Sequence, residues 1–242
     1  MSQNNELSIP TDGLGQSSTE SYRAILEVFD PHHSFALSTH INPDGDAIGS
    51  ELALYSFLRE LGKDVKIFNT DPVPVNYHFL PLFDVVKSPQ ELQDYSPDIL
   101  VILDAGDRNR IGEDLCQILI PTQAVVNIDH HDTGHLFGDF NLVETDASST
   151  SEIVYRLIKH HNMPVGKERA LYLYTGIMFD TGCFRYGNST PIAHRIAADL
   201  IAEGDFSVAE IYRHVYETIP VGKMYLLREV LQTLDLTANG EI

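Results

Sequence analysis

Three short apolar segments of the chain each end in residues that commonly bind metal ions. The residues that follow these segments are His40, Asp104 and the run Asp129-His130-His131. Carboxylate oxygens combined with imidazole nitrogens suit Mn²⁺ and similar divalent cations, whereas a set of thiolates would indicate zinc or an iron–sulfur cluster. The residue types therefore indicate a site for divalent cations, provided that the fold brings the three segment ends together.

A loop with two further carboxylates follows the first of these segments. Gly45 separates Asp44 from Asp46 and permits a tight turn of the backbone, so that both carboxylates can face one point. Carboxylates gathered in this way repel one another unless a cation neutralises their charge. The loop therefore adds two candidate ligands to the first segment end.

The three apolar segments have the composition of strands that are buried on both faces. Residues 35–39, 99–103 and 124–128 do not alternate between apolar and polar side chains, which is typical of parallel sheets covered by helices. Parallel strands all point the same way, so their carboxyl ends lie along one edge of the sheet. We therefore predict one crevice that holds His40, Asp104 and the run 129–131.

Stretches with helical spacing of apolar residues separate these strands. Helices are predicted over residues 21–29, 47–61, 115–120, 168–179, 190–202, 208–218 and 223–234, with another that begins near Thr150. Residues 64–69 predict one more strand. The fold class is therefore α/β, with a doubly wound, mainly parallel sheet flanked by helices on both faces.

In order and spacing, the candidate ligands resemble the four motifs of the DHH phosphoesterase superfamily. The matching residues are His40-x-x-x-Asp44-x-Asp46, Asp104, Asp129-His130-His131 and Asp180-Thr181-Gly182, within a resemblance over roughly residues 20–235. Members include the single-strand exonuclease RecJ, nanoRNases that also remove phosphate from phosphoadenosine phosphate, cyclic-dinucleotide phosphodiesterases and family II inorganic pyrophosphatases. The resemblance implies phosphoester hydrolysis with two metal ions, which activate water and stabilise charge during in-line attack.

The resemblance also implies the ligands of the two ions, which would be Mn²⁺, with Mg²⁺ or Co²⁺ as substitutes. One ion would take His40, Asp44 and Asp104. The other would take Asp46, Asp104, His130 and Asp180. Asp104 would thus bridge the two ions and count as a catalytic residue.

The two adjacent histidines have separate roles in this interpretation. On an extended backbone the side chains of His130 and His131 point in opposite directions, so one imidazole can bind metal while the other reaches the substrate. The resemblance gives His130 to metal and makes His131 the catalytic residue that binds the substrate phosphate or protonates the leaving group. Asp129 would not bind metal itself but would orient a neighbouring imidazole through a hydrogen bond.

Three arginines are candidates for contact with the substrate phosphate, because a guanidinium is a planar fork of donors. Arg108 and Arg110 lie in the loop after Asp104, and Arg110 is the preferred contact, although an ion pair with Asp107 or Glu113 is an equal alternative. Arg185 follows the Asp180 motif and could touch a phosphate, but a surface arginine would look the same.

The turn at residues 148–152, Ser-Ser-Thr-Ser-Glu, also has two interpretations. Ser and Thr are typical N-caps of helices, so capping alone explains the turn. In the superfamily the matching turn packs beside the site, and both interpretations stay open here.

The net charge limits the class of substrate. The chain has 35 acidic and 16 basic residues, with a formal net charge of −19, and such a surface opposes binding of long nucleic acid. We therefore expect a short oligoribonucleotide or a small nucleotide such as phosphoadenosine phosphate as the substrate. The alternatives are a cyclic-dinucleotide phosphodiesterase, a pyrophosphatase or polyphosphatase, and a non-catalytic nucleotide-binding module.

The chain is long enough for one large domain, since 43% of its 242 residues are hydrophobic. We expect a flexible tail at residues 1–19, a catalytic domain at 20–220, and at 221–242 a C-terminal helix that starts a linker to an absent second domain. Without an apolar run of 18 residues or a secretory signal, a cytoplasmic protein with no membrane partner is expected. Cys116 and Cys183 should be reduced thiols, and a homodimer stays open.

Overall fold

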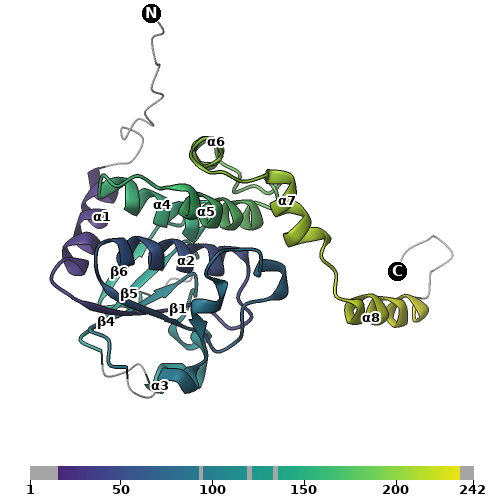
Figure 1. The fold of residues 1–242 in the computed structure, drawn as a ribbon, viewed down its shortest axis with the longest axis horizontal. Coiled ribbons are helices and arrows are strands. Elements are labelled where there is room, and N and C mark those ends of the chain that lie inside the picture. The colour runs from purple at the N-terminus through teal and green to yellow at the C-terminus, as the bar shows by residue number, and fades with distance from the viewer. Residues whose placement is uncertain (1–15, 93–94, 119–121, 133–135, 235–242) are drawn as a thin grey trace, which may run out of the picture.

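The chain folds around a six-stranded parallel sheet. The computed structural model describes residues 16–92, 95–118, 122–132 and 136–234 (Figure 1). The strands are β1 (Ser34–Ser38), β2 (Asp64–Phe68), β3 (Val86–Lys87), β4 (Ile99–Leu103), β5 (Ala124–Asp129) and β6 (Phe140–Val143). They lie in the order β3-β2-β1-β4-β5-β6, and all five neighbouring pairs are parallel. The predicted fold class is confirmed, whereas the two edge strands β3 and β6 were not predicted.

Eight α-helices connect or cover the strands in the described residues. They are α1 (Gln16–Phe29), α2 (Gly45–Glu60), α3 (Glu113–Ile118), α4 (Thr150–His160), α5 (Lys167–Asp180), α6 (Pro191–Glu203), α7 (Val208–Tyr212) and α8 (Val221–Gln232). The single helix predicted over 208–218 is wrong in detail, because α7 gives way to a π-helix at Arg213–Glu217. There the Asn76 side chain donates to the Val215 carbonyl at 3.0 Å, and this carbonyl lies in the last turn of the segment, where it has no donor within the helix.

The two faces of the sheet are covered unequally. Figure 1 shows α1, α2, α4 and α5 on one side of the sheet and α3 on the other. α2 and α4 lie on the strands, and α5 packs across both of these helices. The larger apolar core fills the first side, and a smaller cluster around Phe68, Ile102 and Leu115 fills the second. Helices therefore flank both faces, as predicted.

The central strands explain why their sequences do not alternate. Every residue of β4 is buried. Val101 and Leu103 face the larger core, while Leu100 and Ile102 face the smaller one. A strand between two apolar layers needs apolar residues on both faces, and its polar residues are confined to the strand end, where the candidate ligands lie.

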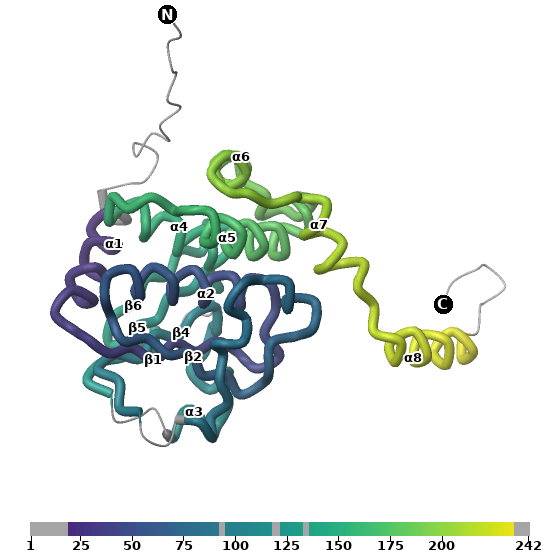
Figure 2. Tube along the Cα trace, in the orientation of Figure 1, coloured from purple at the N-terminus to yellow at the C-terminus, as the bar shows by residue number. Residues whose placement is uncertain are grey.

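The last helix lies apart from the rest of the molecule, as the tube in Figure 2 shows. α8 buries none of its residues, and apolar side chains such as Leu226, Leu227 and Leu231 are exposed. Residues 1–15 and 235–242 of the expected terminal segments lie outside the described residues, and residues 16–19 belong to α1. The domain boundaries and the homodimer remain predictions.

Two further expectations concern helices and cysteines. Among the described residues, no helix has the length and apolar character needed to span a lipid bilayer. Cys116 and Cys183 are both free and half-buried, as expected for reduced thiols.

Candidate metal centre

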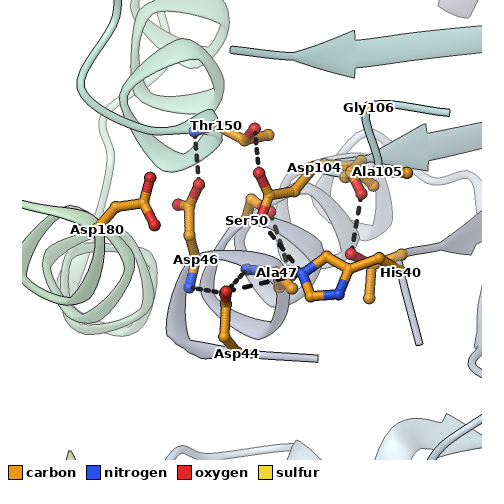
Figure 3. A network of polar contacts seen from close by, with 12 residues as sticks. His40, Asp44, Asp46, Ala47, Ser50, Asp104, Ala105, Gly106, Thr150 and Asp180 are labelled. Carbon is orange, nitrogen blue, oxygen red and sulfur yellow. Dashed lines mark hydrogen bonds and ion pairs between the residues drawn. The ribbon is translucent and has the colours of Figure 1, made fainter. Parts of the chain in front are cut away.

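The carboxyl ends of β1, β4 and β5 bring the candidate ligands to one place. These strands are neighbours in the sheet; Asp104 and His130 follow β4 and β5 directly, and His40 lies two residues after the end of β1. Asp44 and Asp46 enter from the start of α2, and Asp180 enters from the end of α5 (Figure 3). The structure thus brings together all six residues that were predicted as metal ligands.

The ligand atoms fall into three overlapping groups, each with its atoms within 4.8 Å of one another. The groups are His40, Asp44 and Asp104; Asp46, His130 and Asp180; and Asp104, His130 and His131. His40 Nε2 lies 3.8 Å from Asp104 Oδ2, and His130 Nε2 lies 3.5 Å from Asp104 Oδ1. The Asp104 carboxylate therefore stands between the first two groups.

Asp44 serves the helix and the candidate site with different oxygens. It is the N-cap of α2, and its Oδ1 accepts hydrogen bonds from the backbone N–H groups of Asp46 and Ala47. Its Oδ2 lies 3.7 Å from His40 Nε2. The helix start thereby fixes the direction in which the second oxygen points.

Gly45 has a different role from the tight turn expected of it. It is the first residue of α2, and a Cβ there would lie 2.7 Å from Cβ of Phe179 and 3.2 Å from the Tyr77 hydroxyl. The glycine is needed because α5 passes close to the start of α2. This close approach brings Asp46 and Asp180 into the same group.

Asp46 is held by the amino end of α4. Its side chain is 0% exposed, and its two oxygens accept hydrogen bonds from the backbone N–H groups of Thr150, at 2.6 Å, and Ser151, at 2.9 Å. Thr150 Oγ1 also donates to Asp104 Oδ1 at 3.0 Å. The turn at residues 148–152 therefore contacts two candidate ligands in addition to capping α4 through Ser149.

Thr150 and Ser151 were not among the predicted site residues. The Ser/Thr-rich turn was the only indication in the sequence, and capping explained it equally well. Deciding between the two interpretations required the packing of α4 against α2, which local sequence does not specify.

A close crossing of α2 and α5 completes this arrangement. A Cβ on Gly176 would lie 2.0 Å from Ser151 Oγ and 2.7 Å from Asp46 Oδ1, and one on Gly49 would lie 2.5 Å from the Tyr172 carbonyl oxygen. Only glycine lets the helices approach this closely. The crossing therefore sets the position of Asp46 relative to α4 and α5.

The backbone of Asp104 is in the left-handed region, with φ of +57°. For a residue other than glycine this conformation is unfavourable, although aspartate tolerates it better than most residues. The side chain is 2% exposed. Such strain is often found at functional sites, where the surrounding structure maintains it.

The charges of the buried groups indicate that a cation fits the site. Burial and the neighbouring Asp180 raise the pKa of Asp46 from 3.8 to about 7, and burial and Asp46 raise the pKa of Asp104 well above its ordinary value. Burial lowers the pKa of His130, but contacts with Asp104 and Asp180 outweigh this and raise it to about 11. In the absence of metal, bound protons thus reduce the negative charge of the clustered carboxylates. Divalent cations bound to the same oxygens and nitrogens would neutralise this charge more completely.

His131 and His130 do not point in opposite directions. Their ring centroids are 4.5 Å apart, and His131 Nδ1 lies 3.6 Å from the same Asp104 Oδ1 that His130 approaches. The expectation failed because β5 ends at Asp129, so the alternation of a strand does not apply to the two residues beyond it.

The imidazole that Asp129 contacts is His131. Asp129 Oδ1 accepts hydrogen bonds from the backbone N–H of His131, at 3.0 Å, and from its Nδ1, at 2.8 Å. Asp129 Oδ2 accepts from the backbone N–H of Gly106. Burial alone would raise the pKa of Asp129, but these hydrogen bonds lower it, so the carboxylate stays charged and orients His131.

Two of the three arginines proposed for phosphate contact, Arg110 and Arg185, donate hydrogen bonds from their guanidinium groups to the protein itself. Arg110 Nη1 donates to the carbonyl oxygen of Ala105 at 3.0 Å, so the ion pair considered as its alternative role is replaced by a loop contact. Arg185 Nε donates to the Gly182 carbonyl at 2.8 Å. The carbonyl of Arg108 accepts a hydrogen bond from the Cys116 thiol. Arg110 and Arg185 are exposed, and contact with phosphate remains a prediction for all three.

The turn after Asp180 is tied to the start of α4. The Asn188 amide donates to the carbonyl oxygens of Asp180, at 3.1 Å, and Ser148, at 2.9 Å. Gly182, Cys183 and Phe184 all have positive φ. The Asn188 bridge holds the end of α5, and thus Asp180, against the turn that binds Asp46.

Comparison with known proteins agrees with this arrangement. A model of the DHH family, N-terminal domain, matches residues 34–177. A bifunctional oligoribonuclease and PAP phosphatase, NrnA, from Thermus thermophilus is 35% identical over 205 residues, which make up 84% of this chain and 60% of that protein. The protein of the same name from Bacillus subtilis is 30% identical over 220 residues, 89% of this chain and 67% of that protein.

A solved structure shows the same likeness in three dimensions. The crystal structure of an exopolyphosphatase-related protein from Bacteroides fragilis matches with a TM-score of 0.79 and 28% identity, over 90% of this chain and 66% of that one. The present chain spans about 60% of the Thermus relative's length and 67% of the Bacillus relative's. The family match contains every candidate ligand before Asp180 and covers more than half of the sequence, so the chain belongs to the DHH family.

Proposed function

We propose that this chain hydrolyses phosphoester bonds with two divalent metal ions, and that its substrates are short oligoribonucleotides or small nucleotides such as phosphoadenosine phosphate. The observation that carries the proposal is the position of Asp104. One of its oxygens faces His40 and the other faces His130. A carboxylate placed in this way can serve two ions at once, which is the arrangement that two-metal hydrolysis needs.

The residues fit two ions of the Mn²⁺ type. His40, Asp44 and Asp104 would hold one ion, and Asp46, Asp104, His130 and Asp180 would hold the other. Both sets mix carboxylate oxygens with imidazole nitrogens, which suits Mn²⁺, with Mg²⁺ or Co²⁺ as substitutes. When bound, the ions supply an activated water and stabilise the charge that develops on the phosphate oxygens.

His131 is suited to move a proton near the substrate. Its Nδ1 is engaged by Asp129 at 2.8 Å, which fixes the ring and leaves Nε2 for the substrate. The side chain is 40% exposed, so a substrate can reach it. We assign to His131 the binding of the phosphate or the protonation of the leaving oxygen, and to Asp129 the orientation of His131.

Two observations support short nucleotides as substrates. The Thermus and Bacillus relatives are named oligoribonuclease and PAP phosphatase. The net charge of −19 disfavours long polyanions but allows short ones.

The test is a panel of substrates for protein stripped of metal with a chelator and then given Mn²⁺. The panel contains a diribonucleotide, a pentaribonucleotide, phosphoadenosine phosphate, a cyclic dinucleotide and pyrophosphate. We expect turnover of the linear ribonucleotides or phosphoadenosine phosphate only after Mn²⁺ is added. A preference for pyrophosphate or the cyclic dinucleotide would show that the proposed substrate class is wrong. Binding of these compounds without turnover of any of them would indicate a nucleotide-binding module.

A further inference from the structure

A hollow lies at the carboxyl ends of β2 and β3, beside the candidate metal centre. Its volume is about 330 Å³, which is at the lower end of the range of roughly 300–1,000 Å³ typical of small-ligand pockets. Side chains that line it include Asn69, Asp71, His78, Phe83, Lys87 and Glu91. The mechanism proposed above uses none of these residues.

Two hydrogen bonds join one wall of the hollow to the loop that carries candidate ligands. Asn69 Oδ1 accepts from the backbone N–H of Thr39 at 3.3 Å, and Asp71 Oδ2 accepts from the backbone N–H of Asn42 at 2.7 Å. Thr39 precedes His40, and Asn42 lies two residues before Asp44. The hollow and the candidate metal centre therefore share the loop that follows β1.

The lining of the hollow favours a flat aromatic group over a phosphate. His78 and Phe83 are stacked, with ring centroids 4.4 Å apart and planes 16° apart, and aromatic side chains of this kind stack with nucleobases. The lining contains three residues with carboxylates, Asp71, Asp84 and Glu91, and one with an ammonium group, Lys87. This excess of acceptors repels phosphate and favours groups that donate hydrogen bonds, such as exocyclic amines and ribose hydroxyls.

We propose that the hollow binds the nucleoside part of the substrate and prefers a base with an amino group, such as adenine. The base extends the His78–Phe83 stack, while the attached phosphate reaches the metal centre. The substrate role rests on the proposed function, because it assumes that a nucleotide is the substrate.

The test is binding of adenosine, which has no phosphate, to the full chain, measured by saturation-transfer difference NMR. Phe83→Leu keeps an apolar side chain but removes the aromatic face. Phe79→Leu is the matched control, because Phe79 does not line the hollow and stacks on His214, with centroids 4.5 Å apart and planes 16° apart. We expect adenosine to bind about tenfold more weakly to Phe83→Leu, equally to Phe79→Leu, and more tightly than uridine to the wild type.

Three results would overturn the proposal: no transfer from the wild type to adenosine, equal transfer from Phe83→Leu, or an equal loss in Phe79→Leu. If thermal melting shows that Phe83→Leu does not fold, His78→Ala, at an exposed ring of the same stack, takes its place. Hydrolysis of bis(4-nitrophenyl) phosphate, a phosphodiester without a base, reports on the metal centre alone. If the chain hydrolyses this compound but does not bind adenosine, the hollow is not a nucleoside site. If it binds adenosine but shows no Mn²⁺-dependent hydrolysis, the proposed function is wrong.

Discussion

At the scale of single residues, the candidate site depends on carboxylates that share partners. Asp104 contacts His40, His130 and Thr150, while Asp46 uses both oxygens to accept backbone N–H groups. The first arrangement leaves Asp104 available to bridge two ions. The second fixes Asp46 in place before any ion arrives.

We predict that Asp104→Asn removes most of the activity. The amide keeps the shape of the side chain but can neither bridge two cations nor neutralise their charge, so kcat should fall by roughly 10³-fold or more. Mn²⁺ content, measured by elemental analysis after dialysis, should fall by more than one equivalent per chain. Full metal occupancy in this variant would contradict the bridging role.

We predict a different outcome for His131→Ala. This variant should retain its metal ions but lose roughly 10²- to 10⁴-fold in kcat, because a positioned proton donor contributes about this much. A large loss of kcat with unchanged Mn²⁺ content, both measured on the same preparation, would support the role of His131 as proton donor. Loss of one Mn²⁺ equivalent would instead make His131 a ligand, a role that its distance of 3.6 Å from Asp104 allows.

The residues at strand ends could be predicted from the sequence, because each follows an apolar run directly. The six predicted ligands lie together in the structure. The hydrogen bonds of Thr150 and Ser151 could not be predicted, since they depend on how two helices pack. The prediction that the side chains of His130 and His131 point in opposite directions was also wrong, because the sequence does not locate the end of β5 to within one residue.

At the scale of secondary-structure elements, the site depends on the close crossing of α2 and α5 and on the start of α4. Gly49 and Gly176 permit the crossing, and α4 directs two N–H groups at Asp46. The elements were largely predictable from apolar spacing. Their crossing distances were not, because a glycine inside a helix pattern gives no indication of which backbone approaches it.

We predict that Gly176→Ala destabilises the fold by about 1–3 kcal/mol, as overpacking of a core usually does. It should also weaken Mn²⁺ binding, because the added methyl group would lie against Ser151 and Asp46. Denaturant unfolding and a metal titration measure the two effects. Gly187→Ala is the control, since a Cβ at Gly187 meets no atom within 4 Å, and an equal effect of both substitutions would contradict the prediction.

A buried carboxyl group on α2 gives a prediction about pH. Glu51 is fully buried and accepts a hydrogen bond from the Asn69 amide at 2.7 Å. Burial raises the pKa of Glu51 from 4.5 to about 8. The folded state therefore keeps a proton that the unfolded state loses, so this group makes the free energy of unfolding fall as pH rises from about 4.5 to about 8.

We predict that Glu51→Gln, whose side chain cannot ionise, removes this pH-dependent decrease in the free energy of unfolding. Relative to the wild type, the variant should gain stability with rising pH, by at most about 1.4 kcal/mol per pH unit, in denaturant unfolding between pH 5 and pH 8. Glu27→Gln on the exposed face of α1 serves as the control. A stability difference between Glu51→Gln and the wild type that does not change with pH would contradict burial of a neutral Glu51.

At the scale of the whole molecule, the net charge of −19 supports the proposal that the substrates are small. The candidate site lies at one edge of the sheet, where three neighbouring strands end. The parallel sheet was predictable from three buried strands. The edge strands β3 and β6 were not, because β3 has two residues and β6 is only partly buried, so neither produces a clear apolar pattern.

We predict that added salt does not weaken the binding of a short oligoribonucleotide. Proteins with basic grooves lose affinity steeply as salt rises, whereas screening here reduces repulsion between two polyanions. KM for a triribonucleotide should therefore stay constant or fall as KCl increases from low to physiological concentration. Thermal melting at each salt concentration controls for changes in stability, and a steep rise of KM would indicate a basic binding surface.

We predict that two divalent ions around Asp104 perform the hydrolysis, and the decisive experiment is a titration of the metal-free chain with Mn²⁺. Bound Mn²⁺ and the rate of phosphodiester hydrolysis are measured on the same samples. We predict two Mn²⁺ per chain, with activity that appears mainly as the second ion binds. Full activity with one bound ion, or hydrolysis that persists in the metal-free chain, would contradict the two-metal mechanism.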